Sequence, residues 1–438
     1  MSRRVTLLLC AVFACAVLVA ACGDDEGDSG EGGGGAAAEA GSTEGAKVID
    51  PGLMEGAKGE VTYCQGKDTT GNLKDWMARF NKKFEAQGLS VKAVEFPASA
   101  DEQRTQFVQR QESRSGECDV FASDVIWTAE FASQKWLYDL TPYMEEIKDR
   151  FIPATLASAT FEGKLWGAPK NAQAALIYYR TDRVDSAPAT WQDLYEQAAE
   201  KGGIVFQGAA YEGLTCDWLE LAFAAGGTVL SEDGKKATID SPENVAATQL
   251  MVDAIESGAA PKAVSTYMEP ESLAAWQTGD YAFMRNWPYA YPLTQDTPKL
   301  KGKFGVAPLP KFEGAGTAGI LGGANHVISA YSKNPGGALA VIDYLASQEW
   351  QTPYMAEYAE PSPLTATYEA PAVKKAIPFS AELKQGIEQA KARPVSPVYP
   401  QISQAIYNNV NAALSGRLSP EEAMKQAQSD IETALETF

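Results

Sequence analysis

Hydrophobic positions alternate between two spacings in the part of the chain that follows residue 58. Three short apolar runs have the composition of β-strands: GEVTYC (59–64), LSVKAVEF (89–96) and CDVFA (118–122). Between these runs, apolar residues recur at the spacing of a helix. One helix is predicted from Gly71 to a stop at Gly88, and a second begins at Asp101. This alternation predicts a parallel sheet with helices on both faces.

The loops after these strands are the expected place for a ligand, because open α/β sheets bind ligands beyond the carboxyl ends of their strands. Three loops are predicted there, and each is rich in polar groups: GKDTTG (66–71), PASADEQR (97–104) and SDVIWT (123–128).

The rest of the chain alternates in the same way. Further helices are predicted at 190–201, 214–225, 242–257, 271–277 and 336–346. The final helix begins at a capping box, Ser419-Pro420-Glu421-Glu422, with proline in the first helical position. A single core rarely grows beyond about 250–300 residues, so two lobes are expected.

One stretch breaks the alternation. Residues 286–292 read NWPYAYP and bring three large rings between two prolines. Pro288 and Pro292 cannot donate to a helix or to a central sheet ladder, which predicts an irregular segment. So much aromatic surface on an irregular segment suggests a wall for a ligand.

The N-terminus reads as a secretory signal over residues 1–21, with Arg3 and Arg4 ahead of an apolar run that ends in small residues. A transmembrane anchor is the alternative, but the run is short for a bilayer. Val19-Ala20-Ala21-Cys22-Gly23 resembles a bacterial lipobox, which would make Cys22 the lipidated first residue. Residues 22–58 then form a flexible acidic, glycine-rich tether on the outer face of the cytoplasmic membrane.

The charge of the chain excludes one class of partner. The formal net charge is −20, and it becomes −22 without the two signal arginines and −15 without the seven acidic residues of 23–46. An acidic body of this kind argues against nucleic acid and against adhesion to anionic lipid.

Catalytic and cofactor motifs are missing from the sequence. It contains no G-x-S-x-G elbow, H-E-x-x-H or C-x-x-C site, and no glycine-rich phosphate loop after a strand, so no metal or cofactor is expected. The single histidine, His326, is expected to be structural. A carboxylate pair of a glycosidase stays open, since acidic residues are plentiful.

Three cysteines remain in the mature domain, in a compartment that allows disulfides. Cys64 and Cys118 are predicted on strands of one sheet and could form a bridge, but their positions along the strands could also hold them too far apart. Cys216 is expected to be a buried thiol at a helix start.

The many aromatic side chains and the lack of catalytic motifs favour a sugar ligand. A pyranose stacks its C–H faces on aromatic rings, and planar polar side chains satisfy two neighbouring hydroxyls at once. Rings have few rotatable bonds and lose little entropy on binding. A cleft between two hinged lobes would enclose such a ligand.

Several segments resemble a known family. They are GKLWGAP (163–169) leading into ALIYYR (175–180), KGKFGVAPLP (301–310), GILGGANHVIS (319–329) and RPVSPVYPQIS (393–403). Together they resemble the extracellular solute-binding proteins of bacterial ABC sugar importers. Within that family, ADEQRTQFVQR, DVIWTAEFA and ARPVSPVYP are similar to the trehalose- and maltose-binding branch.

The resemblance implies a periplasmic-binding-protein-like fold of type II, with two α/β lobes and a cleft between them. The expected ranges are 59–156 plus 301–348 for the first lobe and 157–300 plus 349–438 for the second. The implied function is capture of a disaccharide or small oligosaccharide for delivery to an ABC permease, by a monomer that performs no chemistry. The alternatives are a secreted carbohydrate-active enzyme and a same-fold binder of peptides or polyols.

The resemblance also implies which residues bind. The expected ligand-binding residues are Asp124, Arg393, Trp287, Tyr289, Arg104, Asn171, Gln173, Gly322, Gly323, Ser99, Asp68 and Glu212. Relatives can carry tryptophan after the glycine pair, where this chain has Ala324. One stacking ring is therefore expected to be missing.

Alternatives stay open at several of these positions. Glu212 and Asp68 could cap helices, and Asp124 and Arg393 could form an ion pair between the lobes without touching a ligand. Tyr291 could fill the junction between lobes. Trp127 and Trp166 are expected in the core or at its rim.

Overall fold

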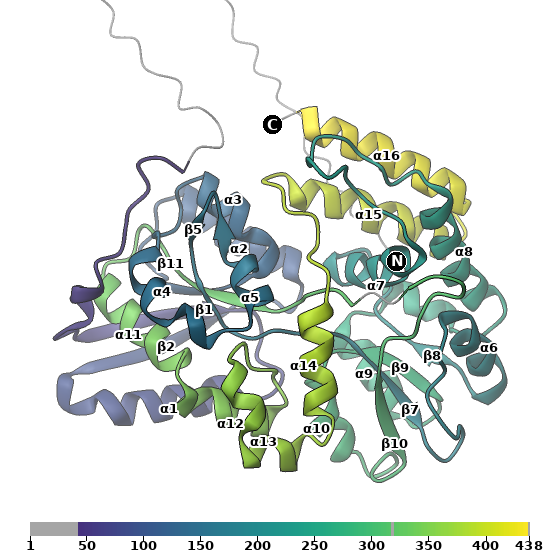
Figure 1. The fold of residues 1–438 in the computed structure, drawn as a ribbon, viewed down its shortest axis with the longest axis horizontal. Helices are drawn as coiled ribbons and strands as arrows, with labels where there is room; N and C mark the ends of the chain where they lie inside the picture. The colour runs from purple at the N-terminus through teal and green to yellow at the C-terminus, as the bar shows by residue number, and fades with distance from the viewer. Residues whose placement is uncertain (1–42, 317–318, 437–438) are drawn as a thin grey trace, which may run out of the picture. The chain divides into compact units, whose positions relative to one another are not determined.

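The computed structural model describes residues 43–316 and 319–436. The predicted signal peptide, Cys22 and the first part of the tether lie outside these residues. The described chain contains two main β-sheets, each covered by helices, and this agrees with the predicted pair of α/β lobes (Figure 1).

The first lobe is built on a five-stranded sheet with the order β2-β1-β3-β11-β6. Its strands are β1 (Gly59–Gln65), β2 (Leu89–Glu95), β3 (Val120–Asp124), β6 (Ala168–Pro169) and β11 (Ala324–Ile328). β1 runs parallel to both β2 and β3, whereas β11 is antiparallel to β3 and β6. The predicted β-α-β-α-β unit at the start of the domain is therefore confirmed.

The second lobe is built on a four-stranded sheet with the order β10-β7-β9-β8. Its strands are β7 (Leu176–Arg180), β8 (Ile204–Val205), β9 (Phe283–Asn286) and β10 (Phe304–Pro308). β7 is antiparallel to β9 and β10, and β8 is parallel to β9. A separate hairpin pairs β4 (Thr160–Phe161) with β5 (Lys164–Leu165).

The helices follow the predicted alternation. Those near the first sheet are α1 (Asn72–Phe84), α2 (Ala100–Glu112), α3 (Thr128–Ser133), α4 (Thr141–Ile147), α5 (Pro153–Ser158), α11 (Pro335–Leu345) and α12 (Gln348–Tyr358). Those near the second sheet are α6 (Trp191–Lys201), α7 (Glu212–Ala225), α8 (Pro242–Glu256), α9 (Glu269–Gln277), α10 (Ala290–Gln295), α15 (Tyr399–Leu414) and α16 (Pro420–Glu436). Between the sheets in Figure 1 runs α14 (Ser380–Gln389), preceded by α13 (Pro371–Ala376). Short 3-10 turns are η1 (Pro51–Met54), η2 (Glu85–Gln87), η3 (Val125–Trp127), η4 (Lys148–Arg150), η5 (Lys262–Thr266) and η6 (Thr365–Glu369).

Local sequence signals explain where several helices begin and end. At α16, the Ser419 amide donates to Glu422 Oε2 at 2.9 Å and the Glu422 amide donates to Ser419 Oγ at 3.2 Å, which is the predicted capping box. Gly88 ends the first helical region with a φ of 68°, a conformation that glycine adopts without a Cβ clash.

Strand pairing corrects the predicted lobe ranges at three places. The segment 160–169 was assigned to the second lobe, but Leu165 and Ala168 pack in the first core and β6 pairs with β11. β10 was assigned to the first lobe, but it pairs with β7. α12 was assigned to the second lobe, yet Trp350 and Tyr354 are buried in the first core. The chain thus crosses between the sheets after β6 and again before β11.

The tether also ends earlier than residue 58. The Ile49 side chain is buried, and its amide donates to the Asp139 carbonyl at 2.9 Å. The Thr43 hydroxyl donates to Glu162 Oε2 at 2.5 Å. Residues 43–58 are therefore part of the folded first lobe.

The segment 286–292 is more regular than its prolines predicted. β9 ends at Asn286, and α10 begins at Ala290 and contains Pro292. The prediction that Pro292 lies outside any helix was wrong. Pro292 is the third residue of α10, where the backbone amide would have no partner within the helix, so its missing N–H costs no hydrogen bond. Only Trp287 to Tyr289 form the irregular turn.

Cys64 and Cys118 are bonded as a disulfide, with Cα atoms 5.9 Å apart. Cys118 precedes β3, and the chain brings it within bridging distance of the end of β1. The bridge that the sequence left open is therefore present. Cys216 is free and buried, as expected.

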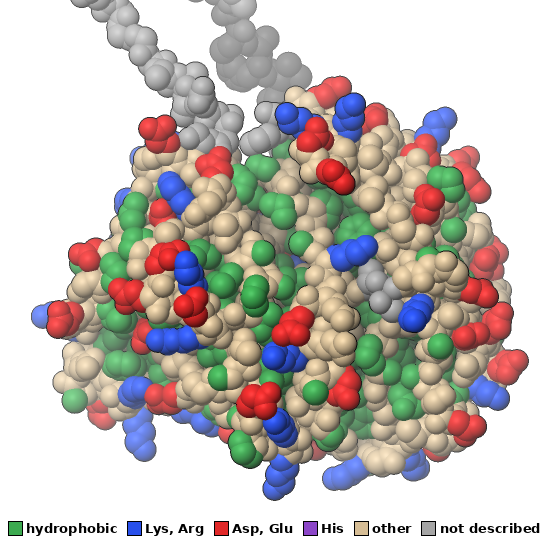
Figure 2. Space-filling model, in the orientation of Figure 1, with side chains coloured by type: hydrophobic (Ala, Val, Ile, Leu, Met, Phe, Trp, Pro, Cys, Tyr) green, Lys and Arg blue, Asp and Glu red, His purple; other side chains and the backbone are tan. Residues whose placement is uncertain are grey.

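The surface carries its charge in a mixed pattern. On the face in Figure 2, acidic and basic side chains are interspersed. Within residues 43–316 and 319–436, none of the helices has the length and apolar character needed to cross a bilayer. The same part of the chain holds no cluster of His, Cys, Asp or Glu suited to a metal ion.

Candidate ligand-binding site

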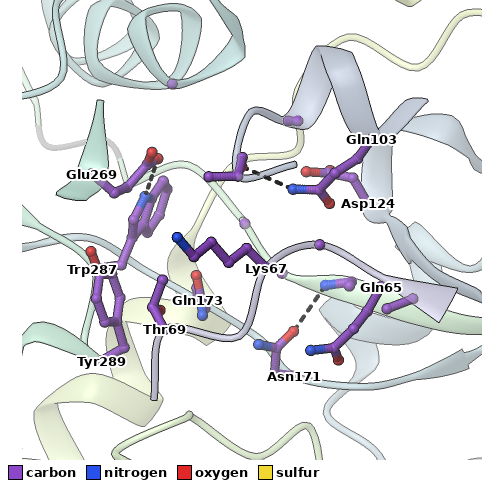
Figure 3. A pocket seen from close by; sticks show the side chains of 18 of the residues that line it. Gln65, Lys67, Thr69, Gln103, Asp124, Asn171, Gln173, Glu269, Trp287 and Tyr289 are labelled. Atoms are coloured by element: carbon purple, nitrogen blue, oxygen red, sulfur yellow. Dashed lines mark hydrogen bonds between the residues drawn. The ribbon is translucent and has the colours of Figure 1, made fainter. Parts of the chain in front are cut away.

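A cavity of about 280 Å³ lies between the two lobes. From the first lobe, the cavity is lined by Gln65 at the end of β1, by Lys67 in the loop that follows, and by Asp124 at the end of β3, where the parallel strands of the sheet end. From the second lobe come Glu269 at the start of α9 and the ring of Trp287 after β9. Figure 3 shows Trp287, Tyr289 and Glu269 on one side of this space and Gln65, Gln103 and Asp124 on the other.

Ten of the twelve expected binding residues line this cavity. They are Asp68, Asp124, Asn171, Gln173, Glu212, Trp287, Tyr289, Gly322, Gly323 and Arg393. The segments that carry them are far apart in sequence and come from both lobes and from the crossings between them.

Ser99 and Arg104 are not brought to the cavity. Arg104 Nε donates instead to Glu130 Oε2 at 2.8 Å. The neighbouring side chain of α2, Gln103, lines the cavity in its place. Successive helix positions point in directions about 100° apart, so a shift of one residue decides which side chain faces the cleft.

Arg393 joins the two lobes through carboxylates on opposite sides. Its Nη2 lies 2.9 Å from Asp124 Oδ1, and its Nη1 lies 2.7 Å from Glu212 Oε1. The arrangement is the interlobe ion pair that the sequence left open. A second contact across the cleft is the Glu212 amide, which donates to Asp101 Oδ2 at 3.1 Å.

Glu212 is satisfied by protein groups. The Tyr399 hydroxyl donates to its Oε1 at 2.7 Å, and the Ser403 hydroxyl donates to its Oε2. Burial raises the pKa of Glu212 to about 7, while the Arg393 guanidinium opposes that rise. Because Arg393, Tyr399 and Ser403 already bond to its carboxylate, Glu212 has little capacity left to accept from a ligand hydroxyl.

Asp68 takes the capping role that was its alternative. Its Oδ1 accepts from the amides of Thr70 and Gly71 at 2.9 and 3.0 Å, and its Oδ2 accepts from the Leu73 amide at 2.9 Å. The bond from Leu73 satisfies one of the free amides in the first turn of α1, and the other two bonds hold the turn that leads into the helix.

Trp287 forms part of an aromatic wall. The Arg285 guanidinium carbon lies 4.2 Å from its ring centroid, which covers one face, and its Nε1 donates to Glu269 Oε1 at 3.3 Å. The Tyr211 hydroxyl donates to the other carboxylate oxygen of Glu269 at 2.6 Å. Only 7% of Trp287 and 8% of Tyr289 is exposed, so both rings offer edges or part of one face to the cavity.

The glycine pair lies in a closely packed part of the site. A Cβ on Gly322 would lie 3.1 Å from Cζ3 of Trp287. Gly323 has a φ of 115°, and a Cβ there would lie 2.5 Å from the Asn171 carbonyl oxygen. Gly323 therefore needs a residue without a Cβ, whereas a side chain at Gly322 would require the Trp287 ring to shift slightly.

Several cavity residues were missed from the sequence. The clearest are Glu360, Glu269, Lys170 and Tyr211. Glu360 accepts from the side-chain amides of Asn171 and Gln173, both at 2.8 Å. Acidic residues are frequent in this chain, and no local pattern sets these two carboxylates apart. Lys67 could have been found, because it lies in the predicted ligand loop 66–71.

The remaining aromatic and imidazole groups are structural. Trp127 and Trp166 are buried in the core of the first lobe. Tyr291 packs against Phe379 with ring centroids 5.0 Å apart, and it is not among the cavity residues. His326 is buried on β11 with its Nδ1 3.1 Å from the Tyr63 hydroxyl, and burial lowers its pKa well below the usual value. It is a neutral core residue, as expected.

A cavity enclosed by two α/β lobes, walled by rings and fixed polar groups, defines a two-lobe solute-binding protein. Comparisons with known proteins agree with this. The sequence profile of bacterial extracellular solute-binding proteins matches residues 66–352. A probable ABC transporter-binding protein of Deinococcus radiodurans is 36% identical over 367 residues, which cover 78% of this chain and 86% of that protein.

Solved structures show the same relationship. Maltose-bound MalE3 of T. maritima is 35% identical with a TM-score of 0.81, and the match covers 85% of this chain and 99% of that one. A solute-binding protein of an ABC transporter from Thermotoga lettingae, bound with α-D-tagatose, is 26% identical with a TM-score of 0.78 and covers 86% and 99%.

The chain therefore belongs to the family of bacterial extracellular solute-binding proteins, and its type II periplasmic-binding-protein fold is confirmed. The family and these relatives are binding proteins and not enzymes, which removes the carbohydrate-active enzyme as an alternative.

Proposed function

We propose that this protein captures a disaccharide, such as trehalose or maltose, and delivers it to the permease of an ABC importer. The observation that carries the proposal is the interlobe cavity, where Trp287 and Tyr289 lie opposite polar side chains of the first lobe. Rings and planar polar groups on facing walls suit a ligand with apolar C–H faces and a hydroxyl rim. The maltose-bound relative at 35% identity supports the same class of ligand.

Closure of the lobes gives the transport step its physical basis. Arg393 and Glu212 of the second lobe contact Asp124 and Asp101 of the first, so the structure has contacts made only when the lobes are together. A ligand that bridges both lobes adds to these contacts and favours the closed form. The permease would recognise the surface that closure presents.

We further propose that Cys22 carries the lipid that holds the protein at the outer face of the cytoplasmic membrane, as a monomer. The support is the sequence Val19-Ala20-Ala21-Cys22-Gly23 after an apolar run, followed by a glycine-rich acidic stretch. The body of the protein would then reach its permease on a tether.

A thermal-shift panel tests the ligand class. The sugars are trehalose, maltose and D-tagatose, with mannitol and a dipeptide as representatives of the polyol and peptide alternatives. A ligand that binds only the folded state raises the melting temperature, by an amount that grows with its concentration over the dissociation constant. We expect the largest shift from an α-linked glucose disaccharide. A shift from the dipeptide or mannitol alone would overturn the disaccharide proposal.

A further inference from the structure

One wall of the cavity is built from two amides and a carboxylate. Asn171 and Gln173 lie on the crossing between β6 and β7, and Glu360 follows the end of α12. All three line the cavity, and Glu360 is only 8% exposed. We refer to Asn171, Gln173 and Glu360 as the amide–carboxylate wall; the first two are seen in Figure 3.

A single oxygen of Glu360 holds both amides. Its Oε2 accepts from Asn171 Nδ2 and from Gln173 Nε2, each at 2.8 Å. An ionised carboxylate only accepts hydrogen bonds, so both amides must turn their NH₂ groups towards it. The carbonyl oxygen of Asn171 then accepts from the Ala324 amide at 2.9 Å, which fixes that side chain at both ends.

The other carboxylate oxygen keeps its capacity to accept. Within the described part of the chain, no protein donor bonds to Glu360 Oε1, and no Lys or Arg nitrogen forms an ion pair with Glu360. The Oε1 atom of Gln173 also receives no bond there. Two residues that line the cavity, Glu360 and Gln173, thus each have a fixed side chain with one oxygen that receives no bond from the described protein groups.

We propose that Glu360 is the residue that makes the site demand a hydroxyl donor from its sugar. Its Oε2 fixes the amide–carboxylate wall, and its Oε1 accepts from one ligand hydroxyl, with Gln173 Oε1 accepting from a neighbouring one. The ligand class is therefore a sugar with two adjacent free hydroxyls, both acting as donors at this wall. This inference rests on the proposed function and deepens it.

The physical cost of a mismatch is high at such a position. A ligand that cannot donate leaves the Oε1 oxygen of a mostly buried carboxylate without a donor. Sites that bond a hydroxyl discriminate strongly against analogues that lack it. For one charged acceptor we expect a loss of about tenfold to a hundredfold in affinity.

The test combines a variant of the protein with analogues of the ligand, and compares the affinities of all the pairs. The dissociation constants of wild type and Glu360→Gln are measured by calorimetry with the best-binding disaccharide and with its monodeoxy and monodeoxyfluoro analogues. Fluorine keeps acceptor character but removes the donor. In wild type, both analogues altered at one particular hydroxyl should bind at least tenfold more weakly than the parent sugar. In Glu360→Gln the parent should weaken at least tenfold, and its advantage over those analogues should fall to about twofold or less.

A matched control separates recognition from packing. Glu357→Gln changes an exposed carboxylate near the end of α12, three residues before Glu360, that pairs with Arg79, and it should bind like wild type. Glu360→Asp keeps the charge but withdraws the carboxylate by one methylene, and it replaces the glutamine variant in this comparison should that variant fail to fold. A purely structural role for Glu360 would weaken parent and analogues equally.

Each outcome decides the inference. An unchanged ratio between parent and analogues, or binding by Glu360→Gln within twofold of wild type, overturns the role of Glu360 while the proposed function stands. Equal affinity of wild type for every analogue has the same meaning. Absence of sugar binding by wild type overturns the proposed function itself, and this inference with it.

Discussion

Arg393 Nη2 lies 2.9 Å from Asp124 Oδ1 and so connects the end of β3 in the first lobe to the segment before α15 in the second. The guanidinium is almost completely buried, and its other terminal nitrogen contacts Glu212. Because its two carboxylate partners come from different lobes, this buried charge keeps both partners only when the lobes are together. Both residues were expected to bind ligand, and the structure shows that they bind each other.

Asp124→Asn tests this connection. Removal of the carboxylate charge leaves the buried Arg393 with Glu212 as its one anionic partner, which should lower the free energy of unfolding by about 1–3 kcal/mol. The closed form loses more than an open form would, so sugar affinity should fall as well. Chemical denaturation and calorimetry measure the two effects.

The control for Asp124→Asn is Asp75→Asn. Asp75 pairs with Arg79 at 2.8 Å on an exposed helix surface, where such pairs contribute about 0–1 kcal/mol. Equal effects of the two substitutions on stability and affinity would contradict a special role for the interlobe pair.

Glu212 gives a pH dependence with a defined sign. Its pKa is raised by burial from 4.5 to about 7 in the folded protein, so the folded state binds more protons than the unfolded state between these values. The contribution of this group to stability is therefore fully present below pH 4.5 and is lost as the pH rises through about 7.

Glu212→Gln should remove that contribution. We expect wild type to lose more melting temperature than the variant between pH 5.5 and pH 8, as followed by circular dichroism. Identical pH profiles would show that Glu212 titrates alike in the folded and unfolded chain.

Gly323→Ala tests the close packing beside the amide–carboxylate wall. The φ of 115° and the 2.5 Å approach to the Asn171 carbonyl leave no room for a methyl group, so the backbone must move. Stability should fall by about 1–3 kcal/mol and sugar affinity by at least tenfold. Gly386→Ala in α14 is the control, since its nearest neighbour would lie at 3.8 Å. Normal sugar affinity in Gly323→Ala would argue that this wall does not touch the ligand.

Cys22→Ser tests the lipid anchor. Without the thiol no thioether to lipid can form, so the protein should either leave the membrane fraction or remain unprocessed. Cell fractionation followed by mass measurement of the N-terminus reads this directly. Membrane retention of a correctly processed serine variant would refute the lipobox interpretation.

The part of the fold that sequence predicted best is the part encoded by local patterns. The unit from β1 to β3 was predicted because apolar spacing, Gly88 and the start near Asp101 are all signals within a few residues. The sheet to which β10 belongs was predicted wrongly, because an apolar strand has the same pattern whichever partner it pairs with. α10 was missed since its proline lies in a first turn, where it costs no hydrogen bond.

The candidate site divides in the same way. Asp124, Arg393 and the glycine pair were found through segments that resemble a family, and they do meet at one cavity. Glu360 and Glu269 were not found, because only the tertiary structure shows which of many carboxylates is buried against amides or a ring. The prediction that Arg104 lines the cavity was wrong by one helix position, because Gln103 does so instead. A sequence pattern does not resolve a difference of one position.

The most direct test of the account is a calorimetric titration of the protein with trehalose and with maltose, with Trp287→Ala alongside wild type. Truncation of a ring in the cavity wall should weaken binding by about 1–3 kcal/mol. We expect wild type to bind one of these sugars at a single site, to return it intact, and to lose affinity by that amount in the variant. No heat of binding from either sugar in wild type, release of glucose, or equal affinity in Trp287→Ala would contradict a cleft that holds an unaltered disaccharide against its aromatic wall.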